Sequence, residues 1–297
     1  MEEKAEQFLE TIIDKKSTVG KKYMAIFELK SLGDHERLIK GFEFLSNSEL
    51  LKHEISYALG QMTYTEKSAD FLVKVMKDES EYPVVRHESA EALANFSSSE
   101  FLPLFNEYEN SQVVELSDTC SISKIKSETF EKLSSLYGKR FSDTKEPAAP
   151  FTSKELEEKL GETITSESIL SYILNKETIL FNKYRSIYFI RDNFSSFSSV
   201  FSKLLKKENR NILGCLFKHE VFFILGQISD DCIFLTPLIK ECIEDQEENE
   251  IVRHEAISAF QSVSDEKEFL AKFIEDKSRL VRESAIVALE VLEYWKE

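Results

Sequence analysis

Cysteine, glycine and proline are scarce in this sequence, and long apolar runs are missing. The four cysteines, at 120, 215, 232 and 242, form no CxxC pair, so we expect reduced thiols of a cytoplasmic protein rather than a disulfide scaffold. Eight glycines and five prolines among 297 residues favour helices joined by short turns over a β-rich chain. The first residues are charged and do not resemble a signal peptide, and apolar stretches such as 221–225 are too short to span a bilayer.

Acidic residues outnumber basic ones by a wide margin. The chain has 54 aspartates and glutamates against 38 lysines and arginines, which gives a formal net charge of −16 at pH 7. A surface of that sign repels nucleic acid and anionic membranes, so we expect neither as a partner and expect a basic partner instead. We also expect a monomer.

Short helical segments recur along the first half of the chain. Apolar residues at helical spacing occur at 22–29, 52–61, 84–93 and, more weakly, 113–120, with partner helices such as 69–77 between them. A period of about thirty to thirty-five residues that carries two short helices is the signature of an α-solenoid. The sequence therefore predicts an all-α protein.

The second half of the chain repeats the first. Residues 182–190 match the first of these segments, and 218–227 match the second down to a shared Leu-Gly-Gln ending. Helical segments at 251–260 and 280–289 complete the set, and the last one keeps the frame without a histidine, as a terminal repeat does. We predict an α-solenoid of about eight helical hairpins in two pseudo-symmetric halves.

A short segment with two prolines separates the halves. Pro147 and Pro150, among small and charged residues, indicate a linker. The polar run at 152–161 is compatible with a helix or with an extension of that linker. The predicted organisation is an N-terminal half at 1–142, a linker at 143–161 and a C-terminal half at 162–297.

Every one of the five histidines is followed by a glutamate. His35-Glu36 lies outside the repeat frame, near a turn or helix start, and we treat it as incidental. The other four pairs are in frame: His53-Glu54, His87-Glu88, His219-Glu220 and His254-Glu255. Equivalent positions of successive repeats lie on the order of 10 Å apart, so each half offers two imidazoles and two carboxylates on one surface. If the halves face each other about a pseudo-twofold axis, all eight side chains share one cleft.

Such a set of side chains fits a metal centre. Clustered carboxylates repel one another unless a cation offsets their charge, and neutral imidazole is the commonest metal ligand in proteins. Two imidazoles with carboxylate oxygens and open positions suit non-haem iron that activates dioxygen, and eight ligands suit two metals. The pattern lacks the second histidine of a zincin and differs from the Glu-x-x-His of ferritin-like bundles.

Each of these sequence features also has a purely structural interpretation. A single His-Glu pair on a helix is usually a solvated face, and the in-frame repetition of four pairs is what favours a metal. Gly60 and Gly226 end two of these helices, where we expect either a C-terminal cap with positive φ or a close approach of the backbone to the cleft. Tyr23 and Tyr184 are expected to pack in the core.

Taken together, these motifs resemble the deoxyhypusine hydroxylase family over nearly the whole chain. The resemblance lies in Lys52-His53-Glu54, in Val85-Arg86-His87-Glu88, and in the repeats of both at His219 and His254. It implies HEAT-like repeats in two symmetric halves and a centre of two non-haem irons. With dioxygen as co-substrate and an external electron donor, that centre hydroxylates the deoxyhypusine side chain of translation initiation factor 5A to form hypusine.

The resemblance also implies which residues form the site. The implied metal ligands are His53, Glu54, His87, Glu88, His219, Glu220, His254 and Glu255. Glu54 and Glu220 are alternatively implied as the carboxylates that hold the amines of the substrate. Two other functions stay open: a metal-free HEAT-repeat scaffold that binds a basic protein partner, and a dinuclear hydrolase that uses zinc or manganese.

Overall fold

The computed structural model describes residues 2–45, 47–97, 99–136 and 145–294, and every regular element in those ranges is a helix. The predicted all-α class is therefore confirmed. Residues 143 and 144 of the predicted linker, and 137–142 before it, lie outside the described residues. No described helix combines the length and the apolar character that a membrane crossing requires. The chain divides into two compact units, Met1–Glu128 with Lys267–Glu297, and Thr129–Glu266.

The first unit contains the N-terminal helices and the C-terminal ones. Its helices are α1 (Glu2–Ile13), α2 (Val19–Ser31), α3 (His35–Phe44), α4 (Glu49–Gln61), α5 (Glu66–Lys77), α6 (Pro83–Asn95), α7 (Leu102–Tyr108), most of α8 (Val114–Leu133), α17 (Lys267–Leu270) and α18 (Arg279–Tyr294). Two 3₁₀ turns, η1 (Ser99–Phe101) and η5 (Ala271–Phe273), join them.

The second unit contains the helices between. They are α9 (Ser153–Leu160), α10 (Ser166–Leu174), α11 (Leu180–Asp192), α12 (Phe194–Leu204), α13 (Lys207–Arg210), α14 (Cys215–Gln227), α15 (Thr236–Glu244) and α16 (Glu250–Val263). Three 3₁₀ turns accompany them, η2 (Ser134–Leu136), η3 (Ser229–Asp231) and η4 (Ile233–Leu235).

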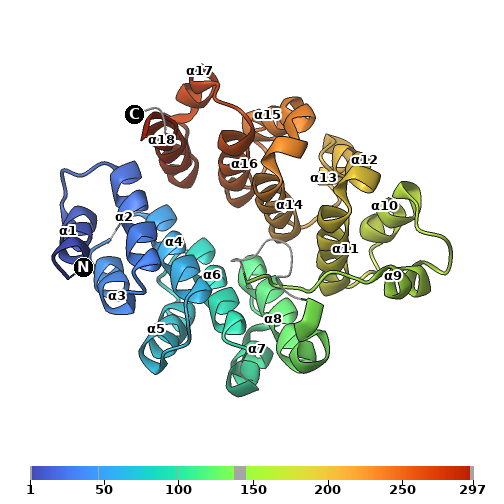
Figure 1. Ribbon diagram of the computed structural model, residues 1–297, viewed down its shortest axis with the longest axis horizontal. Coiled ribbons are helices and arrows are strands. Elements are labelled where there is room, and N and C mark those ends of the chain that lie inside the picture. The colour runs from blue at the N-terminus through green and yellow to red at the C-terminus, as the bar shows by residue number, and fades with distance from the viewer. Residues whose placement is uncertain (1, 46, 98, 137–144, 295–297) are drawn as a thin grey trace. The chain divides into compact units, whose positions relative to one another are not determined.

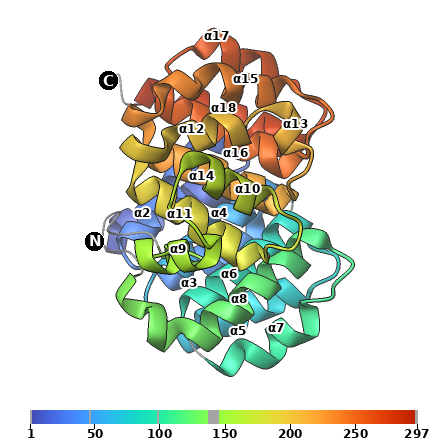
Figure 2. The same cartoon turned by 90° about the vertical axis from the view of Figure 1, so that its right-hand side faces the viewer.

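Helices pair into hairpins, and the second helix of each hairpin packs against its counterpart in the next. In the first unit α2, α4 and α6 lie side by side (Figure 1), each backed by the helix that precedes it. In the second unit α14 packs against both α11 and α16, while α10 lies against α11 and α12 (Figure 2). This arrangement is that of an α-solenoid of HEAT-like hairpins, as predicted.

The inner helices share one internal frame. The four histidines at 53, 87, 219 and 254 each stand four residues after the first residue of their helix, which is Glu49, Pro83, Cys215 or Glu250. The same position holds Tyr23 in α2, Asp118 in α8, Tyr184 in α11 and Glu283 in α18. Along each set of four inner helices, this position is therefore occupied in turn by a tyrosine, a histidine, a histidine and an acidic residue. This agreement in helical phase puts the histidines of neighbouring repeats at matching heights.

Basic residues before the histidines hold the repeats together in the same way in both units. The buried Arg86 donates from Nε to the carbonyl of Met76 at 2.9 Å, and the buried Arg253 donates to that of Ile243 at 2.9 Å. Both carbonyls belong to the last turn of the partner helix, where no intrahelical donor remains. The arginine of the Val-Arg-His-Glu motif therefore anchors the hairpin.

The last helix packs with the first ones. α18 lies against α2 and α4, and Ser48, which caps α4, donates to Glu283 at 2.6 Å. Thr18, which caps α2, donates to Glu290 at 2.5 Å. The compact units thus differ from the predicted stretches 1–142 and 162–297, because the helices from Lys267 onward pack with the N-terminal helices.

The segment that the prolines indicated as a linker is packed into the second unit where it is described. Residues 146–151 are buried, and Arg185 donates to the carbonyls of Ala149 at 3.0 Å and Pro150 at 3.2 Å. The polar run that follows forms α9, which begins with a capping box between Thr152 and Glu155. The open question about 152–161 is thus answered in favour of a helix.

Gly60 serves helix packing rather than a cap. It lies inside α4, and positive φ among the described glycines occurs at Gly33 and Gly161 alone, so the predicted cap is wrong. A Cβ at Gly60 would lie 2.6 Å from the Cβ of Ala92 on α6, whereas one at Gly226 would have 3.8 Å to its nearest neighbour on α16. Tyr184 is buried as predicted, and Tyr23 is half-buried. All four cysteines are free.

Candidate metal centre

Three predicted ligands converge in the first unit. His53 on α4 and His87 and Glu88 on α6 are buried, and each offers a ligand atom within 4.8 Å of the others. The imidazole rings of His53 and His87 are 5.7 Å apart between centroids. The Nε2 atom of His53 lies 3.4 Å from Oε2 of Glu88, and its Nδ1 lies 3.4 Å from Oε1 of Glu54. Adjacent repeats thus place two imidazoles and a carboxylate around one point.

The charges in this set favour a cation. Burial lowers the pKa of His53, but the carboxylates of Glu54 and Glu88 outweigh burial and raise that pKa to about 10. The metal-free protein therefore keeps a proton, and with it a positive charge, on the imidazole between the two carboxylates. A metal ion bound there supplies that positive charge itself and needs the imidazole neutral.

A threonine from the next repeat approaches His87. The hydroxyl of Thr119 on α8 lies 3.4 Å from Nδ1 of His87, and it also donates to the carbonyl of Glu115 at 2.8 Å. A contact at Nδ1 sets the tautomer and the orientation of a ligand histidine whose Nε2 faces the metal. Thr119 carries no sequence signal of such a role, because it stands one residue after the position that the histidines occupy.

The second unit repeats the arrangement. His219 and Glu220 on α14 and His254 on α16 are buried, and Glu255 is nearly so. The rings of His219 and His254 are 5.2 Å apart between centroids, and Nε2 of His219 lies 3.7 Å from Oε2 of Glu255. The first histidine again meets the glutamate of the second pair. Each unit thus offers two histidines and one carboxylate from the second pair.

Glu220 has a partner that its counterpart Glu54 does not share. The buried Tyr188 on α11 donates a hydrogen bond from its hydroxyl to Oε1 of Glu220. Burial and the charge of Glu220 raise the pKa of Tyr188 well above its ordinary value, so the phenol stays protonated and remains a donor. The sequence pattern singles out no role for Tyr188, and its hydroxyl is the feature that was missed.

Lysines that precede the first histidine of each unit brace these helices. Lys52 pairs with Glu81 at 2.5 Å, and Lys218 pairs with Glu248 at 2.5 Å. Both glutamates stand in the turn before the helix that carries the second histidine, α6 or α16. The pairs therefore tie the two His-Glu helices of each unit together.

The donor set fits iron. Two imidazoles with one carboxylate are the ligands of non-haem iron sites that react with dioxygen, and each unit offers that combination from side chains that are buried or, for Glu255, nearly buried. A structural zinc site would use four ligands in a closed tetrahedron and commonly includes cysteine. Cys120 and Cys242 are buried thiols whose pKa burial raises to about 12, so they are not disposed to bind a metal as thiolates.

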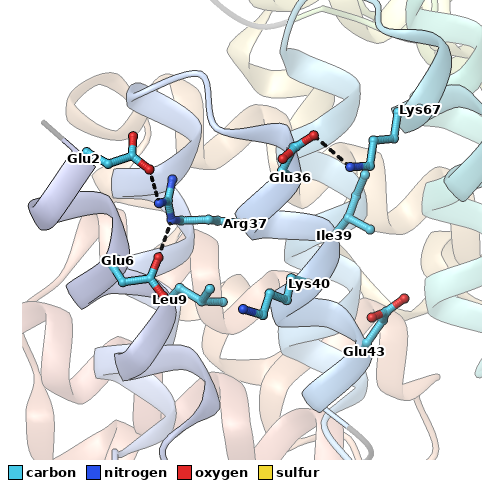
Figure 3. A pocket seen from close by; sticks show the side chains of 9 residues that line it. All are labelled: Glu2, Glu6, Leu9, Glu36, Arg37, Ile39, Lys40, Glu43 and Lys67. Carbon is cyan, nitrogen blue, oxygen red and sulfur yellow. Dashed lines mark hydrogen bonds and ion pairs between the residues drawn. The ribbon is translucent and has the colours of Figure 1, made fainter.

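The fifth histidine and the surface cavities lie apart from this set. His35 is the first residue of α3, as expected of an incidental pair, and its Nδ1 lies 2.7 Å from the hydroxyl of Ser68. A cavity of about 450 Å³ beside α1 and α3 is lined mostly by charged side chains, among which Lys67 pairs with Glu36 at 2.8 Å (Figure 3). Arg37 contacts Glu2 and Glu6 there. Exposed pairs of this kind are ordinary surface charges.

Comparisons with known proteins agree with this geometry. No protein-family model matches the chain. The deoxyhypusine hydroxylase of Drosophila melanogaster is 32% identical over 286 residues, which cover 95% of this chain and 89% of that protein. The enzymes of Candida albicans and Mus musculus, both deoxyhypusine hydroxylases, are each 30% identical and cover 97% and 99% of this chain.

A solved structure is similar over the whole length as well. The structure of human deoxyhypusine hydroxylase in complex with glycerol superposes with a TM-score of 0.84 at 26% identity, covering 99% of this chain and 97% of that one. Sequence and fold lead to the same family. The chain belongs to the deoxyhypusine hydroxylases, a family of HEAT-repeat enzymes.

Proposed function

We propose that this protein hydroxylates the deoxyhypusine side chain of translation initiation factor 5A and so completes hypusine, with two non-haem irons as cofactor. The observation that carries the proposal is the duplicated set of buried or nearly buried side chains, His53, His87 and Glu88 in one unit and their counterparts in the other. The reaction class follows from membership of the family, and the ligand chemistry supports iron.

The protein side chains have separable tasks in this proposal. Six of them would hold the irons: His53, His87, Glu88, His219, His254 and Glu255. Glu54 and Glu220 would bind either a metal or the positively charged amines of the deoxyhypusine arm. When bound, the irons supply the activation of dioxygen that inserts one oxygen atom into a C–H bond. The other oxygen atom leaves as water, for which an external donor provides two electrons and solvent provides two protons.

Burial of the set has a chemical consequence. The side chains of His87 and His254 are almost fully buried, at 1% and 0% exposure. A dry site strengthens the attraction between carboxylates and cations and protects a reactive oxidant from water. The protein thereby binds and orients the arm and excludes water.

The net charge of −16 is consistent with this substrate class. The deoxyhypusine arm carries protonated amines, and opposite charge steers such a partner toward the protein and raises the rate of encounter. A metal-free scaffold that binds a basic partner would share this electrostatic feature. It would have no need for the duplicated imidazole set.

The test is incubation of the iron-loaded, reduced protein with translation initiation factor 5A that carries deoxyhypusine, followed by mass analysis of the substrate. We expect the mass of the substrate to rise by one oxygen atom with the wild-type protein and to stay unchanged with His87→Ala. The scaffold would instead be supported if the protein bound no iron and if His87→Ala changed none of its properties. A protein that binds zinc or manganese, without the visible absorption of an iron centre, would support the dinuclear hydrolase.

A further inference from the structure

We propose that Tyr188 is a positioning residue that holds Glu220 in place for an ammonium group of the substrate, and that this hold is specific to the second unit. The inference rests on the function proposed above and deepens it. It takes Glu220 in its proposed role as a carboxylate for the substrate amines, and it adds a residue that the histidine motifs do not include.

His219 and Glu220 are adjacent in the sequence, but their side chains contact different helices. His219 and Glu220 stand on α14, which packs against α11 on one side and α16 on another. His219 faces α16, where its Nε2 is 3.7 Å from Oε2 of Glu255. Glu220 is instead bonded to Tyr188 on α11. Its carboxylate is thus held toward the helix that contributes no histidine.

The tyrosine is itself firmly held. Its side chain is fully buried, and the guanidinium of Arg191 covers the ring at 4.7 Å from the centroid. Arg191 is buried as well and pairs with the buried Glu146 at 2.5 Å. Because the ion pair is buried and its guanidinium lies over the ring, the phenol is held in one orientation, with its hydroxyl on Glu220.

The bond to Tyr188 suits an amine-binding carboxylate. A hydroxyl that donates to a carboxylate fixes the direction of that carboxylate, as the binding of an ammonium group at one place requires. A carboxylate has two oxygens, so a hydrogen bond accepted at Oε1 is compatible with a charge-assisted one at Oε2. Glu220 therefore combines a fixed orientation with an oxygen that can accept a hydrogen bond from a protonated amine.

The first unit differs at the matching position. Tyr188 stands four residues after Tyr184, and Phe27 stands four residues after the equivalent Tyr23. Phe27 has no hydroxyl, and its ring faces that of Tyr57 on α4 at 6.3 Å between centroids. Glu54 is half-buried and lies 3.4 Å from its own neighbour His53. The two glutamates of the first pairs are thus held differently.

The test compares two tyrosine-to-phenylalanine variants of the full-length, iron-loaded protein. Tyr188→Phe removes the hydroxyl bonded to Glu220. Tyr184→Phe is the matched control, because it removes a buried hydroxyl of the same helix that donates to the carbonyl of Leu216 at 3.0 Å. For each variant we would measure iron per chain, KM and kcat for the deoxyhypusine-bearing initiation factor, and the Kd of metal-free protein for that same factor.

We expect Tyr188→Phe to bind iron like the wild type and to raise both KM and Kd roughly tenfold, the effect of losing one hydrogen bond to a charged group, with a smaller change in kcat. Tyr184→Phe should leave KM and Kd unchanged. In the Glu220→Gln background, Tyr188→Phe should add little further loss, since both changes remove one interaction.

Three results would overturn the inference. They are an unchanged KM and Kd in Tyr188→Phe, an equal rise in Tyr184→Phe, or a loss of iron as the main defect of Tyr188→Phe. A wild-type protein that neither binds nor hydroxylates the deoxyhypusine-bearing factor would overturn the proposed function first, and this inference with it.

Discussion

His53 and Glu88 stand on different repeats, yet Nε2 of one lies 3.4 Å from Oε2 of the other. The second unit has the same relationship between His219 and Glu255, at 3.7 Å. In both units the histidine of the first pair meets the glutamate of the second. The packing of α4 on α6, and of α14 on α16, therefore decides whether a metal set exists.

Loss of one histidine from either unit should remove function without unfolding the protein. We predict that His53→Ala or His254→Ala loses bound iron and hydroxylation, because each removes one of the two imidazoles that its unit offers. Alanine suits a helix, so the far-UV circular dichroism should stay nearly unchanged. His35→Ala is the control, as its His-Glu pair lies outside the repeat frame, and it should keep both properties. Retained hydroxylation by either site variant would contradict the assignment.

The two glycines at the ends of the histidine helices should respond in opposite directions to alanine. Gly60→Ala places a Cβ 2.6 Å from that of Ala92, so we expect a net loss of about 1 to 2 kcal/mol in unfolding free energy. Gly226→Ala meets only ordinary contacts at 3.8 Å and should gain about 0.5 to 1 kcal/mol from helix propensity. Urea denaturation measures both changes. Equal effects of the two substitutions would show that α4 and α6 do not approach so closely.

The ion pair of Glu146 and Arg191 should contribute strongly to the second unit. Glu146→Gln leaves the buried guanidinium with Asp192 as its remaining carboxylate partner, at 3.1 Å. We expect a loss of about 3 kcal/mol in unfolding free energy. The control is Glu167→Gln, which breaks an exposed pair with Lys203 and should leave the unfolding free energy nearly unchanged. A loss that is no larger for Glu146→Gln than for this control would mean that segment 146–151 does not stay packed.

The acid that takes the histidine position in α8 should give stability a pH dependence. Burial, with the charge of Glu115, raises the pKa of Asp118 to about 6. The folded state then favours the protonated carboxyl more than the unfolded state does. The contribution of Asp118 to the unfolding free energy is therefore complete below pH 4 and is lost as the pH rises through 6. We predict that Asp118→Asn stabilises the iron-free protein at pH 8 by about 1 kcal/mol, a value reduced because solvent reaches this half-buried side chain.

The measurement is the unfolding free energy of wild type and variant between pH 4 and 8. The difference between them should grow over that range. The exposed Asp70→Asn on α5 serves as a control without such a trend. A constant difference for Asp118→Asn would show that this carboxyl is not shifted.

The repeat architecture and the eight candidate residues could be predicted from the sequence because both depend on local periodicity. A helix of thirteen or fourteen residues with its histidine four residues after the first places that side chain in the same phase each time. The spacing of the His-Glu pairs in the sequence therefore indicates where each pair lies along the solenoid.

Contacts between distant segments could not be predicted in this way. The helix α18 packs on α2, and nothing in the local pattern of Arg279–Tyr294 names that partner. Small residues such as Ala148 and Ala149 look like a linker, and only their burial against Arg185 shows otherwise. Likewise Tyr188 differs from Phe27 by one hydroxyl, which periodicity does not register, yet it gives Glu220 a partner.

The central claim is tested most directly by following the oxygen atom. The iron-loaded, reduced protein would be incubated with deoxyhypusine-bearing translation initiation factor 5A under dioxygen made of the heavy oxygen isotope, and the substrate analysed by mass. The proposal predicts one heavy oxygen on the deoxyhypusine side chain, and none with His53→Ala or His254→Ala. An unmodified substrate with the wild-type protein, or an oxygen that comes from water instead of dioxygen, would contradict it.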